Sequence, residues 1–101
     1  MSYQVIVQPP AETDIEEAVA WIAQYSPEKA ALWYFDLTEA IESLENFPAR
    51  CPIAPESEEF GYEVRHLIFG KYRILFTIKD EAVRVFHIRH VRRRPLSADD
   101  V

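Results

Sequence analysis

The arginines and histidines in the second half of the chain are the side chains best suited to chemistry. Arg65 and His66 lie on one predicted strand, Arg73 lies on the next, and His90 is followed at once by Arg92–Arg94. An arginine guanidinium binds a phosphate through two parallel hydrogen bonds, and histidine is the side chain that titrates near neutral pH. Cleavage of RNA by its own 2′-hydroxyl requires a base, an acid and groups that stabilise the phosphate. These residues therefore form a candidate phosphodiester site. The alternatives are solvated charges that protect a strand edge and, for His90, a structural histidine at a strand end.

The other reactive side chains indicate no metal, cofactor or nucleophile site. Cys51 is the only cysteine and lies in a predicted loop without an adjacent base, so we do not expect it to be a nucleophile. Glu56, Glu58 and Glu59 lie in the same predicted loop without neighbouring histidines, which is typical of a solvated loop. The sequence contains only two glycines, too few for a glycine-rich phosphate loop. We expect neither a bound metal nor a cofactor.

Charge is divided unequally along the chain. Residues 1–60 hold twelve acidic and two basic side chains, a net charge of −10, whereas residues 61–101 hold nine basic and five acidic ones, a net charge of +4. This division indicates an anionic partner at one surface, while the total of −6 argues against a general nucleic-acid binder. A chain of 101 residues with 49% hydrophobic residues fits one domain, residues 1–101, with its own core. The lone cysteine and the lack of a leader or membrane-length apolar segment lead us to expect a cytoplasmic protein without membrane contact.

Hydrophobic periodicity predicts an α+β domain with the element order β-α-α-β-β-β. Residues 3–8 alternate as in a strand, residues 11–25 have the apolar spacing of a helix, and Ser26-Pro27 is typical of the start of a second helix ending before Pro48. Residues 48–60 are predicted to be an exposed loop. Period-two patterns then predict strands at residues 62–69, 72–78 and 83–88 or a little beyond, followed by a tail without periodicity. We expect a helical hairpin packed on one face of a largely antiparallel sheet, with the first strand at an edge.

Alternation along residues 72–78 assigns side chains to the two faces of the sheet. The apolar set, expected to face the helices, is Tyr72, Ile74, Phe76 and Ile78. Arg73 is then expected to emerge on the open face. The aromatic side chains of the hairpin are expected to be core, with a partner-binding groove as the alternative; they are Trp21, Trp33, Tyr34 and Phe35.

The order and spacing of these segments resemble the RelE/ParE toxin superfamily over nearly the whole chain. The motifs that carry the likeness in the sheet are Val64-Arg65-His66-Leu67, Tyr72-Arg73-Ile74 and Ile88-Arg89-His90-Val91-Arg92-Arg93. Those in the helices are Ala11-Glu12-Thr13-Asp14-Ile15 and Leu44-Glu45-Asn46-Phe47-Pro48. The resemblance implies a bacterial growth inhibitor of a toxin–antitoxin system, a class that includes plasmid-stabilisation systems, neutralised by a cognate antitoxin protein.

The superfamily has two mechanistic branches, and the resemblance gives residues a role in each. In the RelE-like branch, which cleaves mRNA on the ribosome, it implies Arg73, His90 and Arg93 as catalytic residues. In the ParE-like branch, which poisons DNA gyrase, it implies a non-catalytic binding surface; the residues that we assign to binding are Arg65, His66, Arg92 and Arg94.

Departures from the nuclease pattern favour the ParE-like branch. Val64 and His66 stand where RelE-like enzymes carry two lysines, and Ser97-Ala98-Asp99-Asp100 lacks their catalytic tyrosine. The alternatives are a RelE-like endoribonuclease and a degenerate member that only binds its antitoxin. In each case we expect the hairpin and sheet to offer an apolar groove to an antitoxin segment that folds on binding. We also expect antitoxin acids to cover the surface formed by Arg65, Arg73 and Arg92–Arg94.

Overall fold

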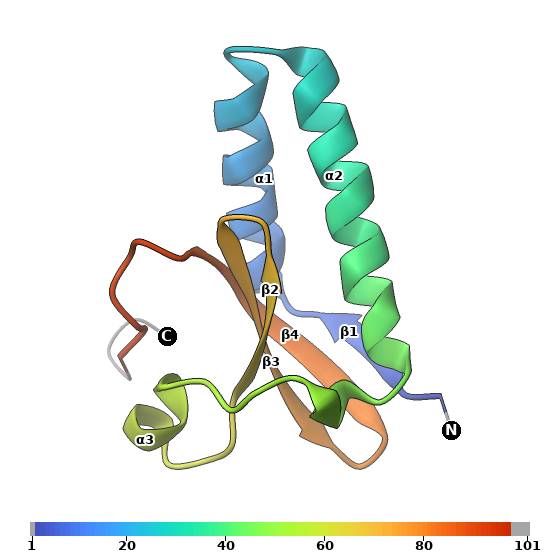
Figure 1. The fold of residues 1–101 in the computed structure, drawn as a ribbon, viewed down its shortest axis with the longest axis vertical. Helices are drawn as coiled ribbons and strands as arrows, with labels where there is room; N and C mark the ends of the chain where they lie inside the picture. The colour runs from blue at the N-terminus through green and yellow to red at the C-terminus, as the bar shows by residue number, and fades with distance from the viewer. Residues whose placement is uncertain (1, 98–101) are drawn as a thin grey trace.

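The computed structural model describes residues 2–97, and it has the predicted α+β architecture (Figure 1). The chain runs through β1 (Gln4–Val7), α1 (Pro9–Ala23), α2 (Pro27–Glu42), the 3-10 turns η1 (Ser43–Glu45) and η2 (Pro48–Arg50), α3 (Glu56–Phe60), β2 (Arg65–Phe69), β3 (Tyr72–Lys79) and β4 (Ala82–His90). The sheet order is β1-β4-β3-β2. β1 is parallel to β4 and the other pairs are antiparallel, which confirms both the largely antiparallel sheet and the edge position of the first strand.

Local sequence signals fix the ends of the helices. α1 begins two residues before its predicted start because Pro9 and Pro10 occupy the first turn, where the backbone N–H has no helical partner to lose. The hydroxyl of Ser26 accepts a hydrogen bond from the N–H of Lys29 at 3.2 Å, so Ser26 is the predicted N-cap of α2. The strand β2 is shorter than predicted, since it begins at Arg65 rather than at residue 62.

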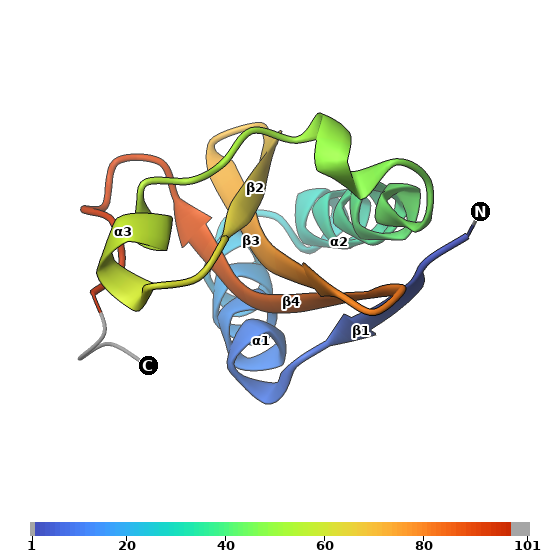
Figure 2. The same cartoon turned by 90° about the horizontal axis from the view of Figure 1, so that it is seen from below.

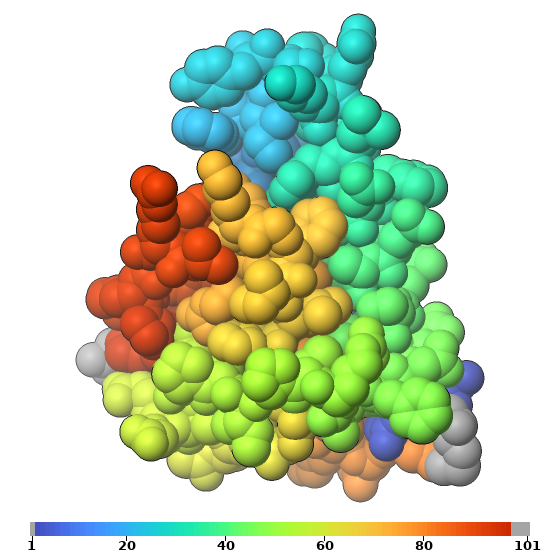
Figure 3. Space-filling model, viewed as in Figure 1, coloured from blue at the N-terminus to red at the C-terminus, as the bar shows by residue number. Residues whose placement is uncertain are grey.

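Each face of the sheet carries its own apolar core. The face towards α1 and α2 packs Ile74, Phe76 and Val85 against Leu37 and Ile41 of α2. The other face is not open, so that prediction is wrong. A smaller core covers it, made of Ala54, Val64, Leu75 and Leu96 with Phe60 and Phe86 around them. Figures 2 and 3 show α3 and its flanking segments lying across this face.

The predicted loop at residues 48–60 is therefore a structural layer that contains η2 and α3. The tail contributes Leu96, whose side chain is only 3% exposed. The predicted tail also included residues 98–101, which lie outside the described residues.

The aromatic side chains of the hairpin are largely exposed, so the prediction that they are core is wrong for most of them. Trp21 is 60% exposed, Tyr34 52% and Phe35 61%, whereas Trp33 packs edge-on against Phe69 and Tyr72. Part of the cause is visible in Figure 1: the hairpin projects beyond the sheet, which leaves the turns near its tip without a layer to pack against. Tyr34 does not belong to these turns, since it lines a groove together with Val5 and Val7 of β1. The partner-groove alternative therefore gains support.

Asp14 of α1 supports the part of β4 that extends past the end of β1. β1 ends opposite Val85, and beyond that point one Oδ atom of Asp14 accepts the backbone N–H of Ile88 at 2.9 Å. The same oxygen lies 2.7 Å from Nδ1 of His87. Because a carboxylate only accepts, Nδ1 of His87 carries the proton in this hydrogen bond.

None of the helices among residues 2–97 is long and apolar enough to cross a membrane.

Candidate functional site

Arg73 lies in a buried ion pair and does not project into solvent. It is 7% exposed, and its two terminal nitrogens donate to the two carboxylate oxygens of Glu56 at 3.0 and 2.6 Å. Glu56, at the start of α3, is fully buried and also accepts the N–H of Leu96 at 3.0 Å. The guanidinium thus already holds a bidentate anion, which is the arrangement that it would make with a phosphate. The prediction that Arg73 emerges on an open face is wrong.

His66 completes this buried cluster. Its Nδ1 lies 2.9 Å from a terminal nitrogen of Arg73 and must accept that hydrogen bond, since a guanidinium only donates. Burial and the positive charge of Arg73 lower the pKa of His66, although Glu56 acts in the opposite direction. Burial by itself raises the pKa of Glu56, but the hydrogen bonds from Arg73 and Leu96 outweigh it and hold that pKa below its ordinary value. The cluster therefore holds a carboxylate, a guanidinium and a neutral imidazole.

Arg65, the first residue of β2, binds the segment that follows η2. Its guanidinium donates to the carbonyl of Ala49 at 3.0 Å, to the carbonyl of Cys51, and to the carboxylate of Glu63 at 3.0 Å. These bonds fasten the segment after η2 to the start of β2. Burial raises the pKa of the Cys51 thiol despite two nearby arginines, which keeps it protonated and unreactive.

His90, Lys71, Arg92 and Arg93 gather at the end of the sheet nearest the helical hairpin. The N–H of Val91 donates to the carbonyl of Lys71 at 2.8 Å, which places the turn after β4 beside the β2–β3 turn. The N–H of Arg92 donates to Nδ1 of His90 at 3.1 Å, and the His90 ring packs edge-on against Tyr72. The side chains of Lys71, Arg92 and Arg93 are exposed.

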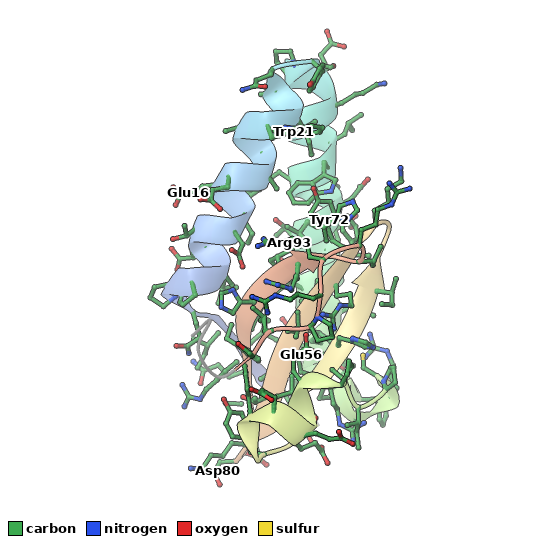
Figure 4. The ribbon with its side chains drawn as sticks, turned by 90° about the vertical axis from the view of Figure 1, so that its left-hand side faces the viewer. Glu16, Trp21, Glu56, Tyr72, Asp80 and Arg93 are labelled. Atoms are coloured by element: carbon green, nitrogen blue, oxygen red, sulfur yellow. The ribbon has the colours of Figure 1, made fainter. Side chains whose placement is uncertain are left out.

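A cavity of about 640 Å³ separates this cationic turn from the projecting hairpin. Its lining consists of Trp21, Ile22, Trp33, Phe69, Gly70, Lys71, Tyr72 and His90. Figure 4 shows Trp21 towards the upper end of the view, Tyr72 and Arg93 below it near the middle of the molecule, and Glu56 further down the sheet beside α3. We call this region the hairpin-tip surface; it comprises the exposed side chains of Trp21, Lys71, Arg92 and Arg93 and the half-buried rings of Tyr72 and His90.

The structure therefore divides the predicted site residues into two sets. Arg65, His66 and Arg73 are held inside a structural layer, while His90, Arg92 and Arg93 lie at the hairpin tip. Arg94 is exposed and its backbone carbonyl accepts from Arg89 at 2.7 Å. These placements do not test a catalytic or binding role.

The sequence prediction misses the role of Glu56, which it places in a solvated loop. Pro55 followed by acidic residues is a helix-start signal that could locate α3. For Trp21 the sequence favours the core, and only the alternative of a partner-binding groove agrees with its exposure.

A four-stranded mixed sheet with a two-helix hairpin on one face and a basic turn at the hairpin end has the fold of the RelE/ParE toxins. More narrowly, the chain belongs to the family described as the ParE toxin of type II toxin–antitoxin system, parDE, which it matches over residues 5–95.

Several solved structures share the fold, among them two toxin–antitoxin structures. The chromosomal ParDE toxin–antitoxin system from P. aeruginosa superposes with a TM-score of 0.71 at 17% identity, over 90% of this chain and 98% of the other. The RelBE2 toxin–antitoxin complex from Mycobacterium tuberculosis gives 0.58 at 21% identity, over 89% and 99%. At these identities the likeness concerns the fold alone. No curated protein sequence matches the chain.

Proposed function

We propose that this chain is a toxin that stops bacterial growth by binding DNA gyrase in the cytoplasm, without cleaving RNA, and that a cognate antitoxin neutralises it. The observation that carries the proposal is the ion pair between Arg73 and Glu56. A nuclease of this superfamily would use Arg73 to contact the scissile phosphate. Here a buried carboxylate binds both terminal nitrogens of the guanidinium, and freeing Arg73 would leave two uncompensated charges inside the protein.

The hairpin-tip surface is the best candidate for contact with the target. Exposed aromatic side chains beside cations are typical of the centres of protein interfaces, where tryptophan, tyrosine and arginine contribute most to binding. Trp21 supplies an exposed indole, and Arg92 and Arg93 supply the cations. This surface needs no rearrangement of the buried cluster to be reached.

A RelE-like endoribonuclease is the second candidate, because His90 lies beside Arg92 and Arg93. In that case His90 would be the acid or base and the arginines would hold the phosphate. A degenerate member that only binds its antitoxin is the third.

Expression of the chain in bacteria, with mapping of mRNA 5′ ends and a DNA-damage reporter, separates these candidates. We expect growth arrest, an induced reporter and no new cleavage sites, together with inhibition of purified gyrase by the purified protein. Arg92→Ala/Arg93→Ala and Trp21→Ala should each abolish toxicity. The matched control Glu56→Leu/Arg73→Met replaces the buried pair by apolar side chains and should stay toxic.

Three results would overturn the proposal. Codon-positioned cuts that disappear in Arg92→Ala/Arg93→Ala would establish the nuclease. Loss of toxicity in a folded Glu56→Leu/Arg73→Met variant would return Arg73 to the active machinery. Absence of any growth effect would indicate the degenerate member.

A further inference from the structure

The cavity between the hairpin and the cationic turn, which we call the hairpin-tip cavity, has a wall of aromatic rings. Trp33 packs edge-on against Phe69 and Tyr72, with ring centroids 6.0 and 5.2 Å apart, and Tyr72 packs in the same way against His90 at 5.3 Å. Trp21 of α1 also lines the cavity, and its side chain is largely exposed. The volume of about 640 Å³ lies within the range of about 300–1,000 Å³ usual for ligand pockets. A planar apolar group therefore has room and ring faces to stack on.

Positive charge surrounds this cavity without a matching carboxylate. Lys71 lines the cavity, and none of the lining residues is acidic. Within residues 2–97, the side chains of Lys71, Arg92 and Arg93 form no ion pair or hydrogen bond with the rest of the protein. Arg65 and Arg73, by contrast, are paired inside the fold. Three unpaired cations at one place attract an anion.

Backbone hydrogen bonds hold these cations beside the cavity. The N–H of Val91 donates to the carbonyl of Lys71 at 2.8 Å, and the N–H of Arg93 donates to the carbonyl of His90 at 3.0 Å. Nδ1 of His90 accepts the N–H of Arg92 at 3.1 Å, so the proton of the neutral ring lies on Nε2. That Nε2–H has no partner among residues 2–97, which leaves a further donor for an anion beside the cations.

A nucleoside phosphate matches both parts of this site. Bases stack on aromatic side chains whatever their identity, because every base has a π-face. Phosphate oxygens accept hydrogen bonds from arginine, lysine and a histidine N–H, and arginine binds them through two parallel hydrogen bonds. An inorganic anion would leave the rings unused, and an uncharged apolar ligand would leave the cations unused.

We propose that the hairpin-tip cavity binds a nucleoside di- or triphosphate. The base lies on the aromatic wall, and the phosphates lie against Lys71, Arg92 and Arg93. The site overlaps the surface proposed for the target, so a bound nucleotide should compete there with gyrase. That consequence rests on the proposed function, whereas the binding of the nucleotide does not.

A single-stranded nucleic acid is the main alternative occupant, since it presents the same bases and phosphates. Its backbone requires a groove of cations that continues along the strand. Residues 1–60, which include both helices of the hairpin, carry a net charge of −10, and the exposed Glu16 and Glu17 precede Trp21 on α1. A strand that leaves the cavity along the hairpin would therefore meet negative charge, which favours a single nucleotide.

Tryptophan fluorescence reports the occupancy of the cavity directly, because both tryptophans of the chain line it. The purified full chain is titrated with ATP, adenosine, inorganic triphosphate and a short single-stranded DNA, without divalent cations, at about 50 and 300 mM salt. We expect ATP to quench the fluorescence and to shift the two indole N–H signals of the ¹⁵N-labelled chain. Adenosine and inorganic triphosphate should each bind about tenfold or more weakly than ATP, and the higher salt should weaken ATP binding.

Removal of cations provides one matched test. Lys71→Ala/Arg92→Ala should weaken ATP binding by about tenfold or more, because charge-assisted hydrogen bonds to the phosphates are lost. The control Lys79→Ala/Arg84→Ala makes the same change in net charge at exposed sites outside the cavity and should bind ATP like the unmodified chain.

Removal of an aromatic ring provides the second test. Trp21→Ala should weaken ATP binding by about tenfold and leave the affinity for inorganic triphosphate unchanged, with Trp33 as the remaining fluorophore. The control Phe35→Ala removes an exposed ring that does not line the cavity, and it should change neither affinity.

The proposal fails if inorganic triphosphate binds as tightly as ATP, which would indicate a general anion patch, or if the chemical shifts map outside the cavity. Tighter binding of the DNA than of ATP would assign the site to nucleic acid and overturn the proposal. Equal loss of affinity in both double variants would indicate a general charge effect and overturn it as well. None of these measurements uses toxicity or gyrase, so failure of nucleotide binding leaves the gyrase proposal standing, and the reverse also holds.

Discussion

Removal of the buried Glu56 should destabilise the protein more than removal of an exposed acidic side chain such as Glu58. Glu56→Ala deletes two hydrogen bonds to Arg73 and one to the N–H of Leu96, all in a region where Glu56 is 0% and Arg73 7% exposed. Loss of one partner of a buried ion pair costs about 3–5 kcal/mol because the other charge stays buried without compensation. At a urea slope of about 2 kcal/mol per molar, the unfolding midpoint should fall by roughly 2 M.

The double variant Glu56→Leu/Arg73→Met completes a mutant cycle. Replacement of a buried pair by apolar side chains of similar size is often neutral or stabilising, and here the N–H of Leu96 loses its acceptor, at about 1 kcal/mol. We therefore expect the double variant to lie within about 2 kcal/mol of the unmodified chain, well above either single variant. Unfolding in urea, followed by tryptophan fluorescence and circular dichroism, measures all four proteins.

Two control variants test whether the loss of stability comes from the buried ion pair. Glu58→Ala removes an exposed carboxylate from the same helix and should change stability by no more than about 0.5 kcal/mol. If Glu56→Ala does not fold, Glu56→Gln retains the side-chain volume and replaces it in the cycle. The reasoning is refuted if Glu56→Ala loses less than about 1 kcal/mol, or if the double variant is no more stable than the single ones.

Three further perturbations test the scaffold. Folding lowers the pKa values of both His66 and Glu56, so the unfolded chain binds more protons than the folded one. The free energy of unfolding should therefore fall as the pH drops below 6.5, the ordinary pKa of His66, and fall again below 4.5, the ordinary pKa of Glu56. Urea midpoints at pH 8, 5.5 and 4 measure this, and His66→Phe should remove the first step only. Asp14→Ala leaves the N–H of Ile88 without an acceptor and should cost about 1–3 kcal/mol, whereas unchanged hydrogen exchange at Ile88 would contradict this role. Ser26→Ala removes the N-cap of α2, at about 1 kcal/mol, which a melting temperature lower by about 4–8 °C would register.

The sequence correctly predicts those parts of the fold that depend on the spacing of nearby residues. The apolar spacing in α1, the Ser26-Pro27 start of α2 and the alternation in β3 depend on residues within one or two turns of each other. The segment before β2 was misjudged because its three prolines and three glutamates are also typical of a loop. Its burial depends on Leu75 and Leu96, which no local pattern connects to it.

Only part of the candidate site could be predicted from the sequence, for the same reason. Alternation correctly separated Arg73 from the helix-facing side chains, but alternation reports the face of a strand and not what covers that face. The partner of Arg73 is Glu56, seventeen positions earlier in the chain, and it reaches Arg73 only because α3 folds back across the sheet. Charge alone could not distinguish the buried Glu56 from the exposed Glu58.

The unequal charge of the two halves therefore has a more specific meaning than attraction to nucleic acid. Part of the positive charge of the second half is neutralised within the fold, at Arg65 and Arg73. The cations that stay exposed include Lys71, Arg92 and Arg93 of the hairpin-tip surface, where the exposed indole of Trp21 also lies. Exposed cations beside an aromatic side chain are typical of the centre of a protein interface, so this local arrangement, and not the net charge of the second half, favours a protein target at the hairpin tip.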